Sequence, residues 1–202
     1  MLSALAERVG AQTPVGTLSR VQGTAIVERG GRKLTALKAM PLMIGDKLQT
    51  SGGADLKIAL TDGSQLTLSE STTLIIDQSV IGPAGANSSI SLLGGKLRSV
   101  IAKRLGDAPI FEVHTPNAVA GVRGTDFETA YIVGKPCPGF PQCFNYTDVG
   151  VYDGIVEVSN PTSHKPVAVR VSGGYEAKVP CDLPPTNPGP LGMSDLAAPG
   201  YH

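Results

Sequence analysis

The sequence predicts an all-β protein in which short, mainly antiparallel strands form a two-sheet sandwich or roll. Apolar and polar residues alternate with a period of two from Val15 to Val179, and helix signals are scarce. Asp-Gly and Gly-Gly pairs separate the alternating segments, as expected where strands are joined by tight turns. A short β-solenoid-like stack is the alternative. The turn glycines Gly63, Gly95 and Gly154 are unevenly spaced, so no strict repeat is established.

The clearest strand pair is predicted on either side of Asp62-Gly63, where residues 56–60 and 64–68 alternate apolar with polar side chains. Similar turns are predicted at Gly94-Gly95, Asp153-Gly154 and Gly173-Gly174. Glycine suits these positions because tight hairpin turns require positive φ. Two polar stretches rich in small residues, 82–89 and 135–145, are predicted to be surface loops.

Composition limits the classes of partner. The 202 residues contain 17 Lys and Arg against 17 Asp and Glu, for a formal net charge of +0, so no global field attracts nucleic acid or an anionic membrane. Aromatic residues make up 4% of the chain and Trp is absent, which disfavours an extended stacking surface for sugars or bases. The length is typical of one folded domain.

We expect the domain to span residues 15–179, between a lead-in at 1–14 and a flexible tail at 180–202 that holds six of the sixteen prolines. Val9-Gly10-Ala11 resembles a signal-peptidase site, but Glu7 and Arg8 interrupt the apolar region that should precede it. The lead-in is therefore either a truncated signal-like segment or a short disordered or helical stretch. No window is long and apolar enough to predict a transmembrane span.

The cysteines suggest an oxidising compartment. Cys137 and Cys143 lie in the proline-rich segment Lys-Pro-Cys-Pro-Gly-Phe-Pro-Gln-Cys, and a disulfide between them is the natural interpretation. Zinc is the competing interpretation, although no CxxC is present and the three histidines are scattered. Cys181 is left over. It either stays buried and inert or pairs with one of the other two, and the spacing does not decide.

One segment resembles a family signature. Residues 111–127, with Phe-Glu-Val-His-Thr-Pro leading into Val-Arg-Gly-Thr-Asp-Phe, are similar to the "F-x-V-x-T-P" strand and "V-R-G-T-x-F" motif of FecR-type domains. Residues 45–50 (Gly-Asp-Lys-Leu-Gln-Thr), 60–64 (Leu-Thr-Asp-Gly-Ser) and 149–158 resemble further elements of that family. The resemblance runs from about Gly16 to Val179, and the insertion carrying Cys137 and Cys143 departs from it.

The resemblance implies a place in bacterial envelope signalling. The best-known FecR-type proteins have an extracytoplasmic part that senses the signalling state of an outer-membrane transporter and a cytoplasmic helical part that controls a sigma factor. The sequence shows neither the helical cytoplasmic segment before Gly16 nor a transmembrane span, so we expect the extracytoplasmic all-β module alone. Its compartment would be periplasmic or extracellular, and its partner a protein of the cell envelope. Direct anti-sigma activity is not expected.

Candidate binding residues are Arg123, Asp126, Lys96 and Arg98. Arg123 and Asp126 flank a glycine and could fix a turn or contact a partner, while Lys96 and Arg98 share one strand face and, with 103–104, form a basic run. His114 is expected to face solvent rather than to bind a metal.

Thr115, Pro116, Gly124, Thr125 and Phe127 are expected to serve structure: proline ends strand pairing and sets a bend, and glycine allows an unusual turn.

No constellation of nucleophile and base, no clustered calcium loop and no phosphate-binding glycine loop occurs in the sequence, so catalytic residues, metals and cofactors are not predicted. We expect a non-enzymatic binding or scaffold module. A cell-wall or glycan-binding module is the alternative and would need exposed rings among Phe140, Phe144, Tyr146, Tyr152 and Tyr175. A hydrolase on a β scaffold would need a perturbed carboxylate pair in a cleft.

Overall fold

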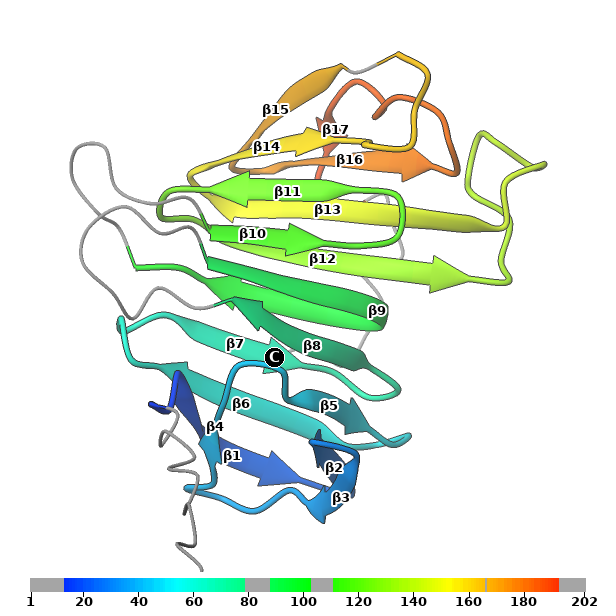
Figure 1. The fold of residues 1–202 in the computed structure, drawn as a ribbon. Helices are drawn as coiled ribbons and strands as arrows, with labels where there is room; N and C mark the ends of the chain where they lie inside the picture. Colours follow the sequence, from blue (N-terminus) through cyan, green and yellow to red (C-terminus); the bar gives the residue numbers. More distant parts are fainter. Residues whose placement is uncertain (1–12, 79–87, 103–110, 166, 193–202) are drawn as a thin grey trace, which may run out of the picture.

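The computed structural model describes residues 13–78, 88–102, 111–165 and 167–192, and this part of the chain is all-β. Its 17 strands form one hydrogen-bonded sheet that folds over into two layers and does not close into a barrel (Figure 1). All strand pairs are antiparallel except β9 with β10, which is parallel. The predicted fold class is therefore confirmed.

Each layer contains nine strands, with β9 (Ser88–Val100) belonging to both. Layer A has the spatial order β4 (Pro41–Leu42), β1 (Gly16–Gln22), β6 (Asp55–Leu60), β7 (Gln65–Leu68), β9, β12 (Asp126–Val133), β13 (Asn145–Asp153), β16 (Tyr175–Pro180) and β17 (Gly189–Pro190). Layer B has the order β3 (Arg32–Thr35), β2 (Ala25–Arg29), β5 (Lys47–Thr50), β8 (Thr73–Gln78), β9, β10 (Phe111–His114), β11 (Val119–Val122), β14 (Ile155–Ser159) and β15 (Ala168–Ser172).

β9 carries the chain from one layer to the other. Its first half pairs with β8 and β10 in layer B, and its second half pairs with β7 and β12 in layer A. The crossing falls at Gly94-Gly95, where a hairpin was predicted, so that prediction is wrong. Gly95 has φ of +85°, and a Cβ there would collide with the backbone of Thr72 at 2.6 Å. The glycine pair turns the strand between layers because only glycine allows both this φ and this close approach.

One of the other predicted turns joins paired strands of the same layer, and two carry the chain between layers. Asp62-Gly63 does join the neighbouring strands β6 and β7, and Gly63 has positive φ. Asp153-Gly154 and Gly173-Gly174, by contrast, carry the chain between layers, from β13 to β14 and from β15 to β16. The chain thus alternates between layers as it advances along the stack (Figure 1).

A single apolar core fills the space between the layers. Leu18, Ile58 and Phe127 enter it from layer A, and Leu48 and Val113 enter it from layer B, all with 0% exposure. These side chains occupy alternate strand positions, which is the periodicity seen in the sequence. Replacing any of these leucines by alanine would cost about 2–5 kcal/mol, because the two layers leave little room to close the cavity.

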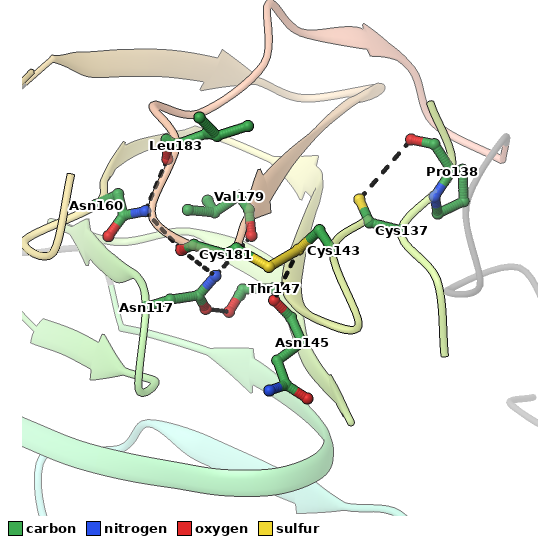
Figure 2. The surroundings of a disulfide bond; sticks show 10 residues. All are labelled: Asn117, Cys137, Pro138, Cys143, Asn145, Thr147, Asn160, Val179, Cys181 and Leu183. Atoms are coloured by element: carbon green, nitrogen blue, oxygen red, sulfur yellow. Dashed lines mark hydrogen bonds between the residues drawn. A yellow bond between two sulfur atoms is a disulfide. The ribbon is translucent and has the colours of Figure 1, made fainter. Parts of the chain in front are cut away.

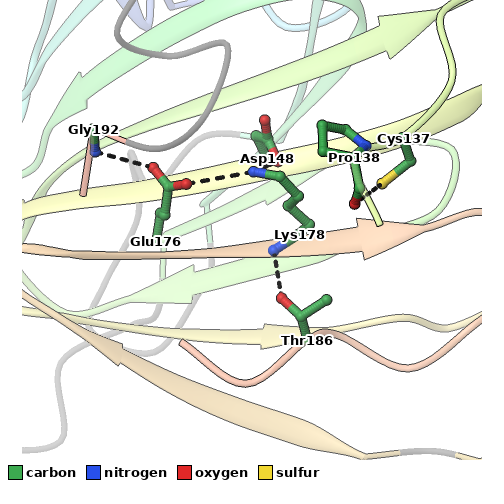
Figure 3. A network of polar contacts seen from close by, with 7 residues as sticks. All are labelled: Cys137, Pro138, Asp148, Glu176, Lys178, Thr186 and Gly192. Atoms are coloured by element: carbon green, nitrogen blue, oxygen red, sulfur yellow. Dashed lines mark hydrogen bonds and ion pairs between the residues drawn. The ribbon is translucent and has the colours of Figure 1, made fainter. Parts of the chain in front are cut away.

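The segment after β16 is ordered further than predicted. The sequence placed a flexible tail at 180–202, whereas β17 pairs with β16 and the chain between them lies on layer A. Figure 3 shows Lys178, whose backbone N donates to Thr186 Oγ1 at 3.0 Å, and Glu176, which accepts a bond from the Gly192 amide at 3.3 Å. These contacts fix residues 181–192 along the layer. Residues 193–202, and the lead-in as far as 12, lie outside the described residues.

In the part of the chain that the structure describes, no helix has the length and apolar character needed to cross a membrane.

Candidate functional site

A groove of about 500 Å³ lies on the outer face of layer B. It lies over β10, β11, β14 and β15, and strand register explains its floor. Gly121 is paired with Glu112 on one side and with Glu157 on the other, and Glu157 is paired in turn with Arg170. Because Gly121 has no side chain, the row of outward residues is interrupted at its centre, and the sheet backbone forms the bottom of the groove.

Charges of both signs line the groove. Arg123, Glu157 and Arg170 are exposed, and none of them forms an ion pair with another described residue. Glu112 is different, since its carboxylate lies 2.7 Å from Nε2 of His114. His114 thus faces outward, as expected from the alternation. The groove thus offers three exposed charged side chains that have no ion-pair partner within the described part of the chain, on a surface open to solvent.

The structure separates Arg123 from Asp126. The chain leaves layer B after Val122 and enters layer A at Asp126, so the two side chains lie on different layers. Gly124, with φ of +117°, makes the crossing possible. Thr125 fixes it, because its hydroxyl donates to the carbonyl of Ile155 at 3.1 Å and its carbonyl accepts a bond from Ile101 N at 2.9 Å. Arg123 then lines the groove, and Asp126 belongs to another cluster.

That second cluster lies on the outer face of layer A and joins three of the four predicted binding residues. Arg98 donates from Nε and Nη2 to the two carboxylate oxygens of Asp126, at 3.0 and 2.9 Å, and its guanidinium lies 4.4 Å from the ring centroid of Tyr152. Tyr152 donates to Glu128 at 3.4 Å, and Lys96 Nζ lies 3.8 Å from Glu128. The cluster was not foreseen because it depends on the register of β9, β12 and β13.

Burial dominates the electrostatics of this cluster. Glu128 is 2% exposed, and desolvation raises the pKa of its carboxyl, although Lys96, the Tyr152 hydroxyl and Arg98 pull in the opposite direction. The hydrogen bonds to Asp126 raise the pKa of Arg98. Asp126 is paired with Arg98, Glu128 contacts Lys96 and the Tyr152 hydroxyl, and neither carboxylate lines the groove. This arrangement links strands and does not provide the carboxylate pair in a cleft that a hydrolase would need.

The Thr-Pro-Asn turn between β10 and β11 ties the two layers together. Asn117 is 6% exposed, and its side-chain amide donates to the carbonyls of Val179 and Cys181 at 2.7 and 3.1 Å. Its carbonyl oxygen accepts a bond of 2.6 Å from the Thr147 hydroxyl, which lies 2.7 Å from Thr115 Oγ1. Pro116 is exposed at the bend. The side-chain hydrogen bonds of this turn thus centre on Asn117.

The disulfide joins Cys143 to Cys181, across 38 residues, so the predicted Cys137–Cys143 bond is wrong (Figure 2). The physical reason is the pairing of β13 with β16, in which Tyr146 lies opposite Pro180 and Cys181 N donates to Asn145 O at 3.1 Å. This register places Cys181 beside Cys143. Cys137 is buried outside the disulfide, and its thiol donates weakly to the carbonyl of Pro138 at 3.7 Å.

The aromatic residues proposed for a glycan-binding surface differ in exposure. Tyr146 is 1% exposed and packs with Cys137 and Cys143, whereas Tyr152 is 40% exposed and has the guanidinium of Arg98 against its ring. Phe144 and Tyr175 are exposed, at 52% and 47%. Among the described residues, no group of three or more His, Cys, Asp or Glu side chains is placed to hold a metal ion. Lys103 and Arg104 lie outside the described residues.

Comparison with known proteins identifies the family. The family model described as FecR protein matches residues 46–157, which is more than half of the chain. The chain belongs to the FecR family. The match includes the Gly-Thr-Asp-Phe segment, the strands β5 to β13 and the first part of β14, and it is shorter than the resemblance seen in the sequence. No curated protein matches this FecR-family chain in sequence.

Two solved structures share its fold. Both are crystal structures of a candidate anti-sigma factor from Parabacteroides distasonis, with TM-scores of 0.50 and 0.51 and 19% sequence identity. In each case the likeness covers 66% of this chain and 54% of the other, so the chain spans about half the length of that protein. At this identity the comparison shows the fold alone.

Proposed function

We propose that this FecR-family chain is a non-catalytic protein-interaction module in bacterial envelope signalling, and that the groove of layer B is its docking surface. The observation that carries the proposal is the groove itself. It is a solvent-exposed hollow in which Arg123, Glu157 and Arg170 have no ion-pair partner among the described residues. Charged groups of both signs that remain exposed can be paired by a protein surface of complementary charge.

Several features support this assignment over catalysis. Arg123 belongs to the Val-Arg-Gly-Thr segment within the family match, and the turn that follows it presents its side chain to the groove. The two clusters rich in polar groups, around Arg98 and around Asn117, hold strands together and face away from the groove. We therefore assign the groove to recognition and those clusters to stability.

The proposed location is the periplasm or the cell exterior. A disulfide such as Cys143–Cys181 persists in an oxidising compartment and is rare in the cytoplasm. Cells expressing the full-length gene are fractionated, and the protein in each fraction is alkylated in denaturant without reductant, since Cys137 is buried. The expected result is a protein in the envelope or medium fraction with one alkylatable thiol. Three alkylatable thiols in a cytoplasmic fraction would contradict the location.

The docking test uses charge reversal. Arg123→Glu and Arg170→Glu change the groove, and Arg32→Glu is the matched control, since Arg32 is an exposed arginine at the opposite end of layer B. Each variant is expressed in the native host, cross-linked in cells, and its captured proteins are quantified by mass spectrometry. An envelope protein recovered with wild type and Arg32→Glu should fall about tenfold with either groove variant. Equal recovery with all variants would overturn the groove assignment.

A further inference from the structure

The end of layer B at β15 is built differently from the other three sheet ends. Layer A ends in β4 and β17, which have two residues each, and each contains a proline. The opposite end of layer B is β3, where Arg32 and Lys33 occupy two of four positions. Short strands, prolines and cations are the features that prevent strand addition at sheet edges. β15 has five residues, with no proline, two valines and one cation, Arg170.

One edge of β15 has open backbone groups. In the part of the chain described, β15 pairs with β14 alone. The bond from Gly173 N to Gly154 O, 3.0 Å, fixes the phase of the ladder, because these residues continue the register in which Ser172 lies opposite Ile155. Hydrogen-bonded pairs alternate in an antiparallel ladder, so Val169 and Val171 bond to β14. The N–H and C=O groups of Ala168, Arg170 and Ser172 therefore point to the open edge.

The side chains beside this edge specify a partner with two different faces. Arg170 points outward at the side of the groove and has no described ion-pair partner. Val171 is buried, and Val169 is partly buried against the core. Val167, which directly precedes β15, is 47% exposed. An additional strand would thus meet a cation on its outer face and, on its inner face, the incompletely covered side chains of Val167 and Val169.

We propose that the open edge of β15 binds an extended strand of a partner protein, which adds to layer B with an acidic side chain opposite Arg170 and apolar side chains beside Val167 and Val169. The added strand would also form a wall of the groove, so that its acidic residues and the groove charges are recognised together. This inference rests on the proposed docking role of the groove and specifies the form and chemistry of the partner.

The test measures binding of a short synthetic peptide of alternating valine and aspartate to the full chain. The peptide carries a fluorescent label, and binding is followed by fluorescence anisotropy. A peptide of alternating valine and lysine is the charge control. Ala168→Pro removes an N–H from the open edge without changing a functional side chain. Lys33→Pro is the matched variant at the other end of layer B, since the bond from Ala36 N to Ala25 O, 2.9 Å, places the Lys33 N–H on the open side of β3.

The valine–aspartate peptide should bind wild type and Lys33→Pro equally and Ala168→Pro about tenfold more weakly, which corresponds to the loss of one backbone hydrogen bond. Arg170→Ala should remove the preference for aspartate over lysine. Hydrogen exchange should show protection of the Ala168, Arg170 and Ser172 amides when the peptide is bound. This protection provides the test if Ala168→Pro does not fold.

Binding of neither peptide would overturn the inference, as would equal losses for Ala168→Pro and Lys33→Pro. Self-association of the chain that Ala168→Pro abolishes, measured by sedimentation, would also overturn it, because a second copy would then occupy the edge. The proposed function fails separately. If charge reversal in the groove abolishes envelope capture but Ala168→Pro does not, the groove binds a partner without strand addition. If charge reversal has no effect, the docking role itself is wrong.

Discussion

Asn117, in the β10–β11 turn of layer B, donates a 2.7 Å hydrogen bond to the carbonyl of Val179 at the end of β16 in layer A. The same amide nitrogen donates to the carbonyl of Cys181, which directly follows β16. A second asparagine, Asn160, donates to Cys181 O at 2.9 Å. The carbonyl of a disulfide-bonded residue is thus held by two side chains from layer B, and the layers are joined by polar contacts as well as by the core.

Asn117→Ala should therefore destabilise the fold by about 2–3 kcal/mol. The variant removes two donated bonds and leaves the Thr147 hydroxyl without its acceptor in a buried site. Urea denaturation followed by circular dichroism measures the change. Asn145→Ala, an exposed asparagine at the start of β13, is the control and should be within about 0.5 kcal/mol of wild type. Equal effects for both would show that the interlayer contact is not stabilising.

Gly95 and Gly94 provide a matched pair of substitutions at the layer crossing. Gly95→Ala should cost about 2–4 kcal/mol, because its Cβ would collide with the Thr72 backbone and its φ of +85° disfavours any side chain. A Cβ at Gly94 would have no heavy atom within 4 Å, so Gly94→Ala should change stability by less than about 1 kcal/mol. Thermal unfolding of the two variants tests the assignment, and a larger loss at Gly94 would contradict it.

The three cysteines should behave differently. Peptide mapping of the non-reduced protein should recover a fragment linking Cys143 to Cys181, with Cys137 as the thiol. In the chain-entropy model, closing a loop of this length stabilises by about 4 kcal/mol. Cys181→Ser should lose most of that, whereas Cys137→Ser should retain the disulfide. Recovery of a fragment linking Cys137 to Cys143 would show that the connectivity is wrong.

Glu128→Gln should stabilise the protein at neutral pH but not in acid. Because burial raises the folded-state pKa of Glu128 above the ordinary value of 4.5, the folded state holds the proton more tightly than the unfolded state. Wild type therefore loses stability as the pH rises from the ordinary value through the folded-state pKa, and the glutamine variant does not. The difference in melting temperature, variant minus wild type, should be larger at about pH 8 than at about pH 4.

Gln65→Ala, at an exposed position of β7, is the control, because neither glutamine nor alanine titrates. Its melting temperature relative to wild type should change little between the two pH values. The Glu128 variant could instead show no pH-dependent gain in melting temperature over wild type. Lys96 and Arg98 would then fully offset the desolvation of the carboxylate, and the raised pKa of Glu128 would be wrong.

Local sequence signals located most strands but did not assign them to layers. Alternation identified the apolar positions that now fill the core, such as Leu66 and Leu68 after Asp62-Gly63. Three further glycine turns were recognised as turns, but each was interpreted as joining paired neighbours. Whether a turn keeps the chain in one layer or carries it to the other depends on what packs beneath it, as Thr72 does at Gly95. That information lies 23 residues away in sequence.

For the candidate site, too, the sequence identified individual residues but not their arrangement in space. The sequence marked Arg123, Arg98, Lys96 and Asp126 as charged residues beside turns and strands, but it could not show that Arg123 faces a groove while the others interlock on the opposite layer. Glu112, Glu157 and Arg170 were missed, since each is an ordinary polar residue in a two-residue alternation. They become neighbours only through the registers of β10, β11, β14 and β15.

Taken alone, the sequence determined the all-β class, the family and the positions that enter the core, because these depend on periodicity and on short motifs within a few residues of each other. The tertiary structure decided the disulfide partner, the layer crossings, the extent of the ordered segment after Pro180 and the composition of the groove. These depend on the register between strands distant in the chain. A register is set by the sum of core packing and ladder hydrogen bonds, as in the pairing of Tyr146 with Pro180 that brings Cys181 to Cys143.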